Sequence, residues 1–195
     1  MWIFLLLVLS PFTVNSFGNF GQGCESQLLL GFLLGNTLDG FSAGSLFGNP
    51  SCPTGFMTLQ GCSKNDCYFF STEARTWEEA RIDCINRGAH LTIVKNANEN
   101  TAIKTQLGTI NPAVAHWNAL NDIHTEGTFR WDPFTKALQS GAFTDFTANM
   151  GGNNATSDCV AFNQTAFTWA TLPCNSTQRY VCERKASKQF SCNAH

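Results

Sequence analysis

The sequence feature that most constrains the fold is a pair of cysteines near the C-terminus, Cys159 and Cys174, which enclose two short alternating segments. Apolar side chains recur every second residue in 160–162 and again in 167–169. This period predicts two half-buried strands, with a turn at 163–165 between them. The two cysteines can then lie on neighbouring strands, where a disulfide would remove roughly 3 kcal/mol worth of unfolded-state entropy.

A third cysteine, Cys182, lies in the short apolar run 180–182 and needs a partner elsewhere in the chain. The obvious candidate is Cys84, which lies on an amphipathic helix predicted to begin after Thr76. Thr76 and Glu79 form a capping-box pattern, and Gly88 is expected to end the helix. The buried face of this helix is expected to contain Trp77, Ala80, Cys84 and Ile85.

The other predicted elements follow in chain order. An opening hairpin is expected over 52–70 and an alternating strand over 90–94. A second helix is expected to begin at Asn96–Glu99 and to stop at Gly108. A third apolar patch begins at 117–120, and an alternating strand is predicted at 128–131 after a turn. Residues 141–157 lack periodicity and are rich in Gly, Asn and Thr, which indicates a long loop of the kind that often has a function.

Nine cysteines indicate an oxidising compartment. No C-x-x-C pair is present, which argues against a zinc ribbon. Residues 1–16 have no charged side chain and contain a compact apolar run that is too short to span a bilayer. They are interpreted as a signal peptide cleaved after Ser16, and the product is therefore expected to be secreted and extracellular.

The composition divides the remaining chain into three parts. Residues 17–51 are rich in Gly, Phe and Leu, with only Glu25 and Asp39 charged, and are interpreted as a weakly packed extension. A single domain is expected over 52–185, followed by a tail over 186–195. From the start of this domain, basic and acidic residues balance, so the chain lacks the field that would attract nucleic acid or an anionic membrane. No membrane span is expected.

The extension contains one motif associated with catalysis, the G-x-S-x-G pattern at 40–44. A nucleophile elbow needs a strand before the serine and a helix after it, and neither is predicted here. No catalytic residue is therefore assigned, and the chain is not expected to be an enzyme.

From Cys52 to Arg184 the sequence closely resembles a C-type lectin-like domain. The matching motifs are Trp77-x-x-Ala80-x-x-x-Cys84-x-x-x-Gly88-Ala89-His90-Leu91, Trp117 to Leu120, Glu126-Gly127-x-Phe129-x-Trp131, Asp158-Cys159-Val160 and the Cys174 to Cys182 ending. The resemblance implies an α+β fold with two helices, two small antiparallel sheets and a long loop region.

The resemblance also implies a set of disulfides. They are Cys84–Cys182 and Cys159–Cys174, and in the long form of the domain an additional bridge, Cys52–Cys67. Cys24, Cys62 and Cys192 remain, and an odd number cannot all pair within one chain. Cys62 and Cys192 can approach each other in or beside the domain. We therefore expect Cys24 in the apolar extension to link two chains in a disulfide-bonded homodimer.

The departures from the family pattern concern calcium. Many sugar-binding members have Glu-Pro-Asn or Gln-Pro-Asp in the long loop and Trp-Asn-Asp on a later strand, and these oxygens bind a calcium ion that chelates the sugar. Here the corresponding residues are Gly151-Gly152-Asn153 and Trp169-Ala170-Thr171. Calcium prefers six to eight oxygens, several of them charged, so this sugar-chelating site is expected to be lost. Asn153 and Trp169 remain as ligand-binding candidates.

Three acidic residues match a second, structural calcium site of the family, namely Asp122, Glu126 and Asp158. Asn154 and Ser157 replace two of the usual carboxylates, and the alternative is that the acidic residues only cap turns or face solvent. Calcium is thus a possible structural ion, with no cofactor required. Three N-glycosylation sequons begin at Asn154, Asn163 and Asn175.

These observations favour a secreted recognition protein that binds a glycan or a microbial or cell-surface ligand without calcium chelation of the sugar. The alternative is a protein-binding module with no sugar activity, because this fold is also used for protein contacts and fold alone does not fix function.

Overall fold

The computed structural model describes residues 49–110, 113–134, 137–147 and 156–188. Residues 50–187 form one compact unit, whose first and last segments pair through a bridge between Ser51 and Ser187. The expected signal peptide, most of the extension and all but the start of the tail lie outside the described residues. Within the described part of the chain, no helix is long and apolar enough to cross a membrane.

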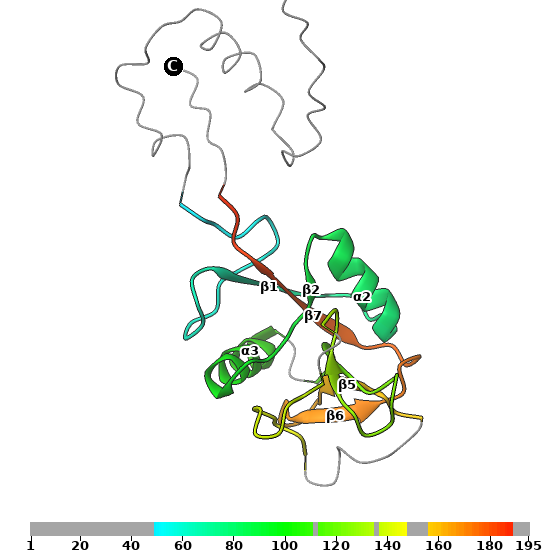
Figure 1. Cartoon of the computed structure of the whole chain (residues 1–195). Helices are drawn as coiled ribbons and strands as arrows, with labels where there is room; N and C mark the ends of the chain where they lie inside the picture. The colour runs from blue at the N-terminus through cyan, green and yellow to red at the C-terminus, as the bar shows by residue number, and fades with distance from the viewer. Residues whose placement is uncertain (1–48, 111–112, 135–136, 148–155, 189–195) are drawn as a thin grey trace, which may run out of the picture. The chain divides into compact units, whose positions relative to one another are not determined.

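The described elements are two helices and seven strands, in an α+β order (Figure 1). They are β1 (Asp66–Phe70), α2 (Trp77–Asn86), β2 (His90–Leu91), α3 (Ala97–Ile110), β3 (His116–Asn121), β4 (Arg130–Trp131), β5 (Cys159–Phe162), β6 (Trp169–Leu172) and β7 (Arg179–Lys185). The expected fold class is confirmed.

The strands form two antiparallel sets that join in one mixed sheet. Strand β7 pairs with β1 and β2, whereas β3 pairs with β4 and β5, and β5 pairs with β6. A short parallel pairing of β3 with β7, at His116–Arg179 and Trp117–Tyr180, connects the two sets. The two small sheets expected from the resemblance are therefore continuous through β7.

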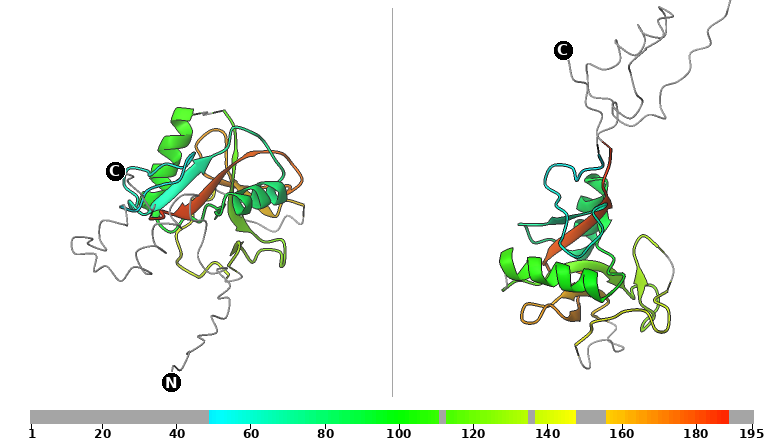
Figure 2. Two further views of the ribbon diagram at one scale, coloured as in Figure 1. Left: turned by 90° about the horizontal axis from the view of Figure 1, so that it is seen from above. Right: turned by 90° about the vertical axis from the view of Figure 1, so that its left-hand side faces the viewer.

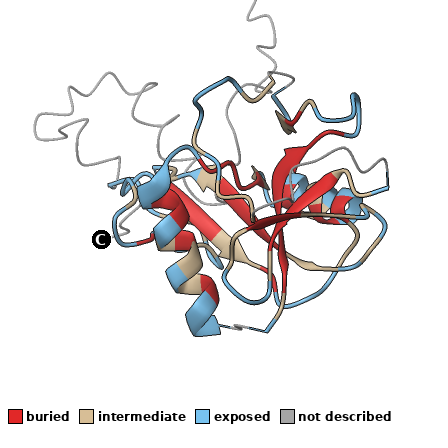
Figure 3. Ribbon diagram, turned by 90° about the horizontal axis from the view of Figure 1, so that it is seen from below, coloured by how far each residue is buried: buried red, intermediate tan, exposed pale blue. Residues whose placement is uncertain are grey.

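The period-two pattern of the strands distributes their side chains between two apolar clusters. On β7, Tyr180 and Cys182 belong to the cluster that includes α2, whereas Val181 belongs to the cluster that includes α3. Successive residues of a strand point to opposite faces, so the sheet separates the two helices (Figure 1; Figure 2). The strands are mostly buried and the helices expose their outer sides, as Figure 3 shows.

Helix α2 begins as the sequence predicts. The Thr76 hydroxyl accepts a hydrogen bond from the Glu79 backbone, and the Glu79 carboxylate in turn accepts one from the Thr76 backbone N–H. Gly88 follows the helix with φ of +66°, a conformation that favours glycine. Trp77, Ala80 and Cys84 are buried, but Ile85 is 50% exposed, so its expected place on the buried face is wrong.

Three disulfides connect the elements as expected. Cys84–Cys182 joins α2 to β7, Cys159–Cys174 joins β5 to the segment after β6, and Cys52–Cys67 joins the N-terminal segment to β1. Cys62 is the free cysteine of the described residues, and it is half-buried. Cys24 and Cys192 lie outside these residues.

Several predicted boundaries differ from the structure. Helix α3 continues through Gly108 to Ile110, because a single glycine costs a helix only about 1 kcal/mol relative to alanine and Leu107 is anchored in the core. The strand expected over 90–94 is reduced to β2. The first arm of the expected hairpin contributes one isolated bridge, Met57 to Tyr68. Phe167 has a left-handed backbone and precedes β6 rather than belonging to it.

Candidate functional site

Two of the three predicted calcium ligands lie together at one end of β3. Asp122 follows β3 directly, and its backbone N–H donates to the carbonyl oxygen of Asp158 over 3.0 Å. Asp158 in turn directly precedes β5, the neighbouring strand. Antiparallel pairing of β3 and β5 therefore brings the two residues to the same end of the sheet. We call Asp122 and Asp158 the carboxylate pair.

The carboxylate pair has unused acceptors. Asp122 Oδ2 accepts a hydrogen bond from the Gly127 backbone over 2.8 Å, but Asp122 Oδ1 and Asp158 Oδ1 are buried with no hydrogen-bond partner among the described residues. Burial raises the pKa of the Asp122 carboxyl, and the negative charge of Asp158 raises it further. A cation in contact with both oxygens would satisfy them and remove this repulsion, so the pair has features that suit a structural calcium ion.

Glu126 does not complete this site in the structure. Its side chain is exposed, in the turn between Asp122 and β4. Among the described residues, the one group of three acidic side chains whose ligand atoms lie within 4.8 Å of one another is elsewhere, and it does not include Glu126. A calcium site at Asp122, Glu126 and Asp158 stays a prediction, with two of its three residues together.

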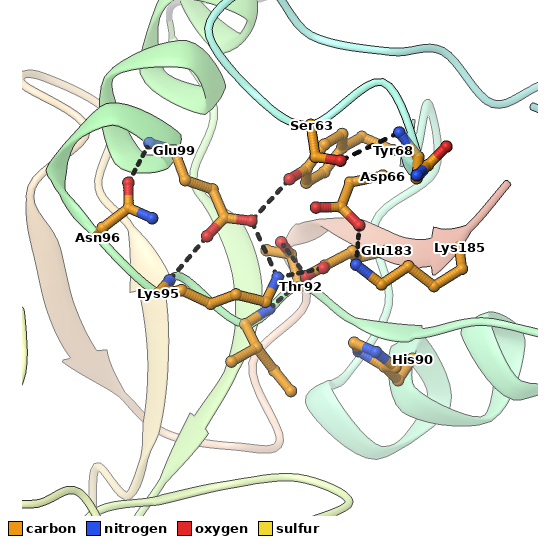
Figure 4. Close-up of polar contacts among 12 residues, drawn as sticks. Ser63, Asp66, Tyr68, His90, Thr92, Lys95, Asn96, Glu99, Glu183 and Lys185 are labelled. Carbon is orange, nitrogen blue, oxygen red and sulfur yellow. Dashed lines mark hydrogen bonds and ion pairs between the residues drawn. The ribbon is translucent and has the colours of Figure 1, made fainter.

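That second acidic group, Asp66, Glu99 and Glu183, was not recognised in the sequence. All three side chains are nearly buried, although they come from β1, α3 and β7 (Figure 4). The signal available in the sequence is a charged residue directly beside a cysteine in an apolar strand. Asp66 precedes Cys67 and Glu183 follows Cys182, but nothing local relates either residue to Glu99.

Two lysines form ion pairs with all three carboxylates of this group. The Lys95 ammonium contacts both Glu99, at 3.1 Å, and Glu183, while Lys185 contacts Asp66. The Tyr68 hydroxyl donates to Glu99 over 2.6 Å, and the Ile93 backbone N–H donates to Glu183 over 3.1 Å. We call Asp66, Glu99, Glu183, Lys95 and Lys185 the lysine-closed cluster. Since the ammonium groups occupy the place of a cation, its carboxylates do not fit a calcium site.

The ion pairs also affect proton affinities inside the cluster. The carboxylates of Glu183 and Glu99 raise the pKa of the Lys95 ammonium, despite the opposing effect of its partial burial. Burial and the hydrogen bond to Glu99 raise the pKa of Tyr68 far above its usual range. The lysine and the tyrosine therefore stay protonated across the physiological range. The charges of the cluster stay the same over this range, which fits a structural role.

The predicted ligand-binding residue Trp169 is completely buried at the start of β6. The rings of Trp131, Phe143 and Phe146 pack nearly perpendicular to it, with centroid distances of 5.6–5.8 Å. Its indole N–H donates to the Asn100 side chain over 3.1 Å. Direct contact between this ring and a ligand is therefore not available in the structure, and its role is to connect β6 to α3. Asn153, the other candidate, lies outside the described residues.

The strand that carries calcium-binding carboxylates in many sugar-binding members has none here. After the buried Trp169, Ala170 is 4% exposed and Thr171 is partly buried. The Trp169 backbone is also covered, because its N–H donates to the carbonyl oxygen of Asp145 and its own carbonyl oxygen accepts from Thr147. In this region β6 thus offers only the partly buried Thr171 side chain and no carboxylate.

Two of the three sequons can be placed. Asn175 is exposed in the segment between β6 and β7. Asn163 is half-buried in the β5–β6 turn, where its oxygen accepts from the backbone of Thr165 and Ala166 and its amide nitrogen donates to Thr168. This nitrogen is the atom that a glycan would modify, so Asn175 is the more accessible of the two. Asn154 lies outside the described residues.

The match to a known family lies within the compact unit 50–187. The family model of the lectin C-type domain matches residues 73–184. The human protein "C-type lectin domain family 17, member A" is 31% identical over 140 residues, and human CD209 antigen is 28% identical over 137 residues. Each alignment covers 70% of this chain but only 33% and 31% of the relative, so the chain spans about a third of the length of these proteins.

Solved structures show the same fold at lower identity. The mouse scavenger receptor C-type lectin carbohydrate-recognition domain has a TM-score of 0.61 and 22% identity, and the alignment covers 70% of this chain and 98% of that domain. A calcium-independent type II antifreeze protein has a TM-score of 0.60 and 20% identity, with 72% of this chain and 98% of that protein covered. At these identities the similarity establishes the arrangement of the elements.

Proposed function

Because this chain belongs to the family of lectin C-type domains, we propose that it is a secreted recognition protein that binds glycans of a microbial or cell surface without calcium chelation of the sugar. The relatives named as C-type lectins and the carbohydrate-recognition domain of the same fold support carbohydrate or ligand recognition in general. The proposed absence of calcium chelation is specific to this chain and depends on its own residues.

One observation supports sugar binding without calcium chelation. On β6 the residues after Trp169 are a buried alanine and a partly buried threonine, where many sugar-binding members have an amide and a carboxylate. An ion that chelates sugar hydroxyls needs charged oxygens of the protein on its other side. Ala170 and Thr171 supply no carboxylate. A bound sugar must then be recognised by direct hydrogen bonds and apolar contacts.

Glycan-array binding in the presence of calcium and in EDTA tests this proposal. We expect the same glycans to bind with equal intensity in both conditions, because no sugar–calcium bond is lost when the ion is removed. A matched variant, Thr171→Asp, adds one carboxylate at the predicted position and should not create calcium dependence by itself, since a single new oxygen is far from a full shell. Complete loss of binding in EDTA that calcium restores and magnesium does not would contradict the proposal.

A protein partner is the second candidate, and exposed apolar side chains favour it. Ile82 and Ile85 are 45% and 50% exposed and lie one turn apart on α2. Such pairs are common at protein contacts, although single exposed apolar residues are ordinary. If the array shows no glycan binding while a receptor-library screen yields a partner whose affinity falls in Ile85→Asn, the protein-binding function is the correct one.

The proposal includes secretion and dimer formation through Cys24. Three disulfides in one small domain are typical of an oxidising compartment. Burial raises the pKa of the Cys62 thiol, which lowers its thiolate content and makes it a poorer partner for a second chain than a cysteine in the apolar extension.

Non-reducing electrophoresis of the secreted protein tests the dimer. We expect a band at twice the monomer mass that reducing agent removes and Cys24→Ser abolishes, while Cys62→Ser retains it. A monomeric band for the unaltered protein, or a dimer that persists in Cys24→Ser, would disprove the assignment.

A further inference from the structure

A polar groove lies between α3 and the segment 143–145, on the α3 side of the sheet. It has a volume of about 330 Å³, within the lower range of ligand pockets. Its wall combines a partly exposed aromatic ring, Phe143, with the side chains of Asn100, Lys104 and Asp145 and the hydroxyl groups of Thr101 and Thr105. We call this surface the α3 groove.

The polar groups of the α3 groove are held by a chain of hydrogen bonds that begins in the core. The buried Trp169 indole donates to Asn100 Oδ1, and Asn100 Nδ2 donates to Asp145 Oδ2 over 2.7 Å. The Lys104 ammonium contacts the same oxygen at 2.8 Å. Asn100 is only 4% exposed, so its amide has one orientation and fixes the carboxylate of Asp145 in turn.

The exposed end of this hydrogen-bond chain still has donors and acceptors that a ligand can use. Both contacts of the Asp145 carboxylate end on Oδ2, and Oδ1 has no hydrogen bond to another described residue. The ammonium of Lys104 has three protons and uses one of them on Asp145, and both side chains are 27% exposed. Thr101 and Thr105 donate their hydroxyl protons to backbone carbonyls of α3, which leaves their oxygens as acceptors.

We infer that the α3 groove is a metal-independent subsite for a neutral sugar ring, an assignment that rests on the proposed function. A carboxylate oxygen and an ammonium beside each other match two adjacent sugar hydroxyls, one donating and one accepting. The partly exposed aromatic ring of Phe143 suits the apolar C–H side of the sugar ring. Asp145 and Lys104 cancel in charge, which favours a neutral polyol over an anion or a metal ion.

The Trp169 indole N–H provides a local readout, because it lies two hydrogen bonds from the Asp145 carboxylate. We would titrate the ¹⁵N-labelled protein in EDTA with methyl α-D-mannopyranoside, methyl β-D-galactopyranoside and N-acetyl-D-glucosamine. At least one sugar should shift the Trp169 indole resonance. The Trp117 indole, which donates to the Arg75 carbonyl away from this groove, is the internal control and should not shift.

Substitutions then locate the site. Asp145→Asn should weaken binding of the same sugar about tenfold or more, because a charged hydrogen-bond acceptor is lost while the shape is kept. Glu73→Gln removes an exposed carboxylate that is also paired with a basic side chain, Arg75, and should leave binding unchanged.

The outcomes separate the two proposals. Calcium-independent glycan binding that is unaffected by Asp145→Asn and does not shift the Trp169 resonance would overturn the groove assignment and leave the proposed function intact. Sugar binding that disappears in EDTA would contradict both, and so would the absence of any sugar or glycan binding.

Discussion

Two buried acidic sites in this domain each lie beside a disulfide, but only one of them contains its own cations. In the lysine-closed cluster, Glu183 follows Cys182, and Lys95 and Lys185 form ion pairs with the three carboxylates. In the carboxylate pair, Asp158 precedes Cys159, and one oxygen of each residue has no partner among the described residues. The carboxylates of the first site have lysine partners within the domain, whereas those of the second site need a proton or an external cation.

The difference indicates different roles for the two sites. A cluster that is fully paired and held by β1, α3 and β7 gives a fixed arrangement, so its contribution is to stability. A pair of carboxylates with unpaired oxygens is expected to respond to cations and to pH. Each of the following predictions tests one side of this contrast.

The largest effect is expected from the disulfides beside the two sites. The double variant Cys84→Ser/Cys182→Ser opens a loop of about 100 residues, which corresponds to about 4.7 kcal/mol of unfolding free energy in the chain-entropy model. Cys159→Ser/Cys174→Ser opens a loop of about 15 residues and should cost about 3 kcal/mol. Secretion yield and urea denaturation measure both. Equal losses would show that the segments beside the two sites are not held differently.

An intermediate effect is expected inside the lysine-closed cluster. Lys95→Met leaves Glu99 and Glu183 buried without their shared cation and should lower the free energy of unfolding by about 2 kcal/mol. This is less than for a fully buried pair, because the lysine side chain is 46% exposed. Lys185→Met, whose side chain is 71% exposed, should cost less, and the exposed Lys64→Met serves as the control. An unchanged urea midpoint in Lys95→Met would refute the structural role.

The local elements were predicted better than the sites, for physical reasons, and the full set of disulfides came from the family resemblance. The cap at Thr76, the turn at Gly88 and the alternation of β5 depend on residues a few positions apart, so local patterns contain them. The face of α2 was predicted less well. Ile85 fits the helical period as well as Cys84 does, but packing against the sheet leaves it at the surface.

The sites depend on contacts that no local pattern records. Asp66, Glu99 and Glu183 meet only after β1, α3 and β7 have assembled, so the cluster was not predicted. Trp169 was assigned to ligand binding from its position in a motif. Its burial follows from Phe143 and Phe146, which lie in a segment without periodicity and cover it only in the folded chain.

The smallest effect is expected at the carboxylate pair, where it is also the most informative. If calcium binds there, an ion concentration ten times the dissociation constant should raise the free energy of unfolding by about 1.4 kcal/mol, and the variant Asp158→Asn should lose this response. Glu126→Gln tests the predicted third ligand. The lysine-closed cluster gives the contrast, since Glu183→Gln should change stability without changing the calcium response.

The pH dependence in EDTA gives the same pair a second test. The pKa of the Asp122 carboxyl is raised in the folded protein, so the folded state binds a proton more tightly than the unfolded state. The contribution of this carboxyl to the free energy of unfolding is therefore fully present below its unfolded pKa. It is lost as the pH rises through its folded pKa. Asp122→Asn should remove this contribution, and calcium should reverse it by favouring the ionised form. Thermal unfolding that shows neither a calcium response nor a difference between Asp122→Asn and the unaltered protein over this range would mean that the two acidic sites do not differ as proposed.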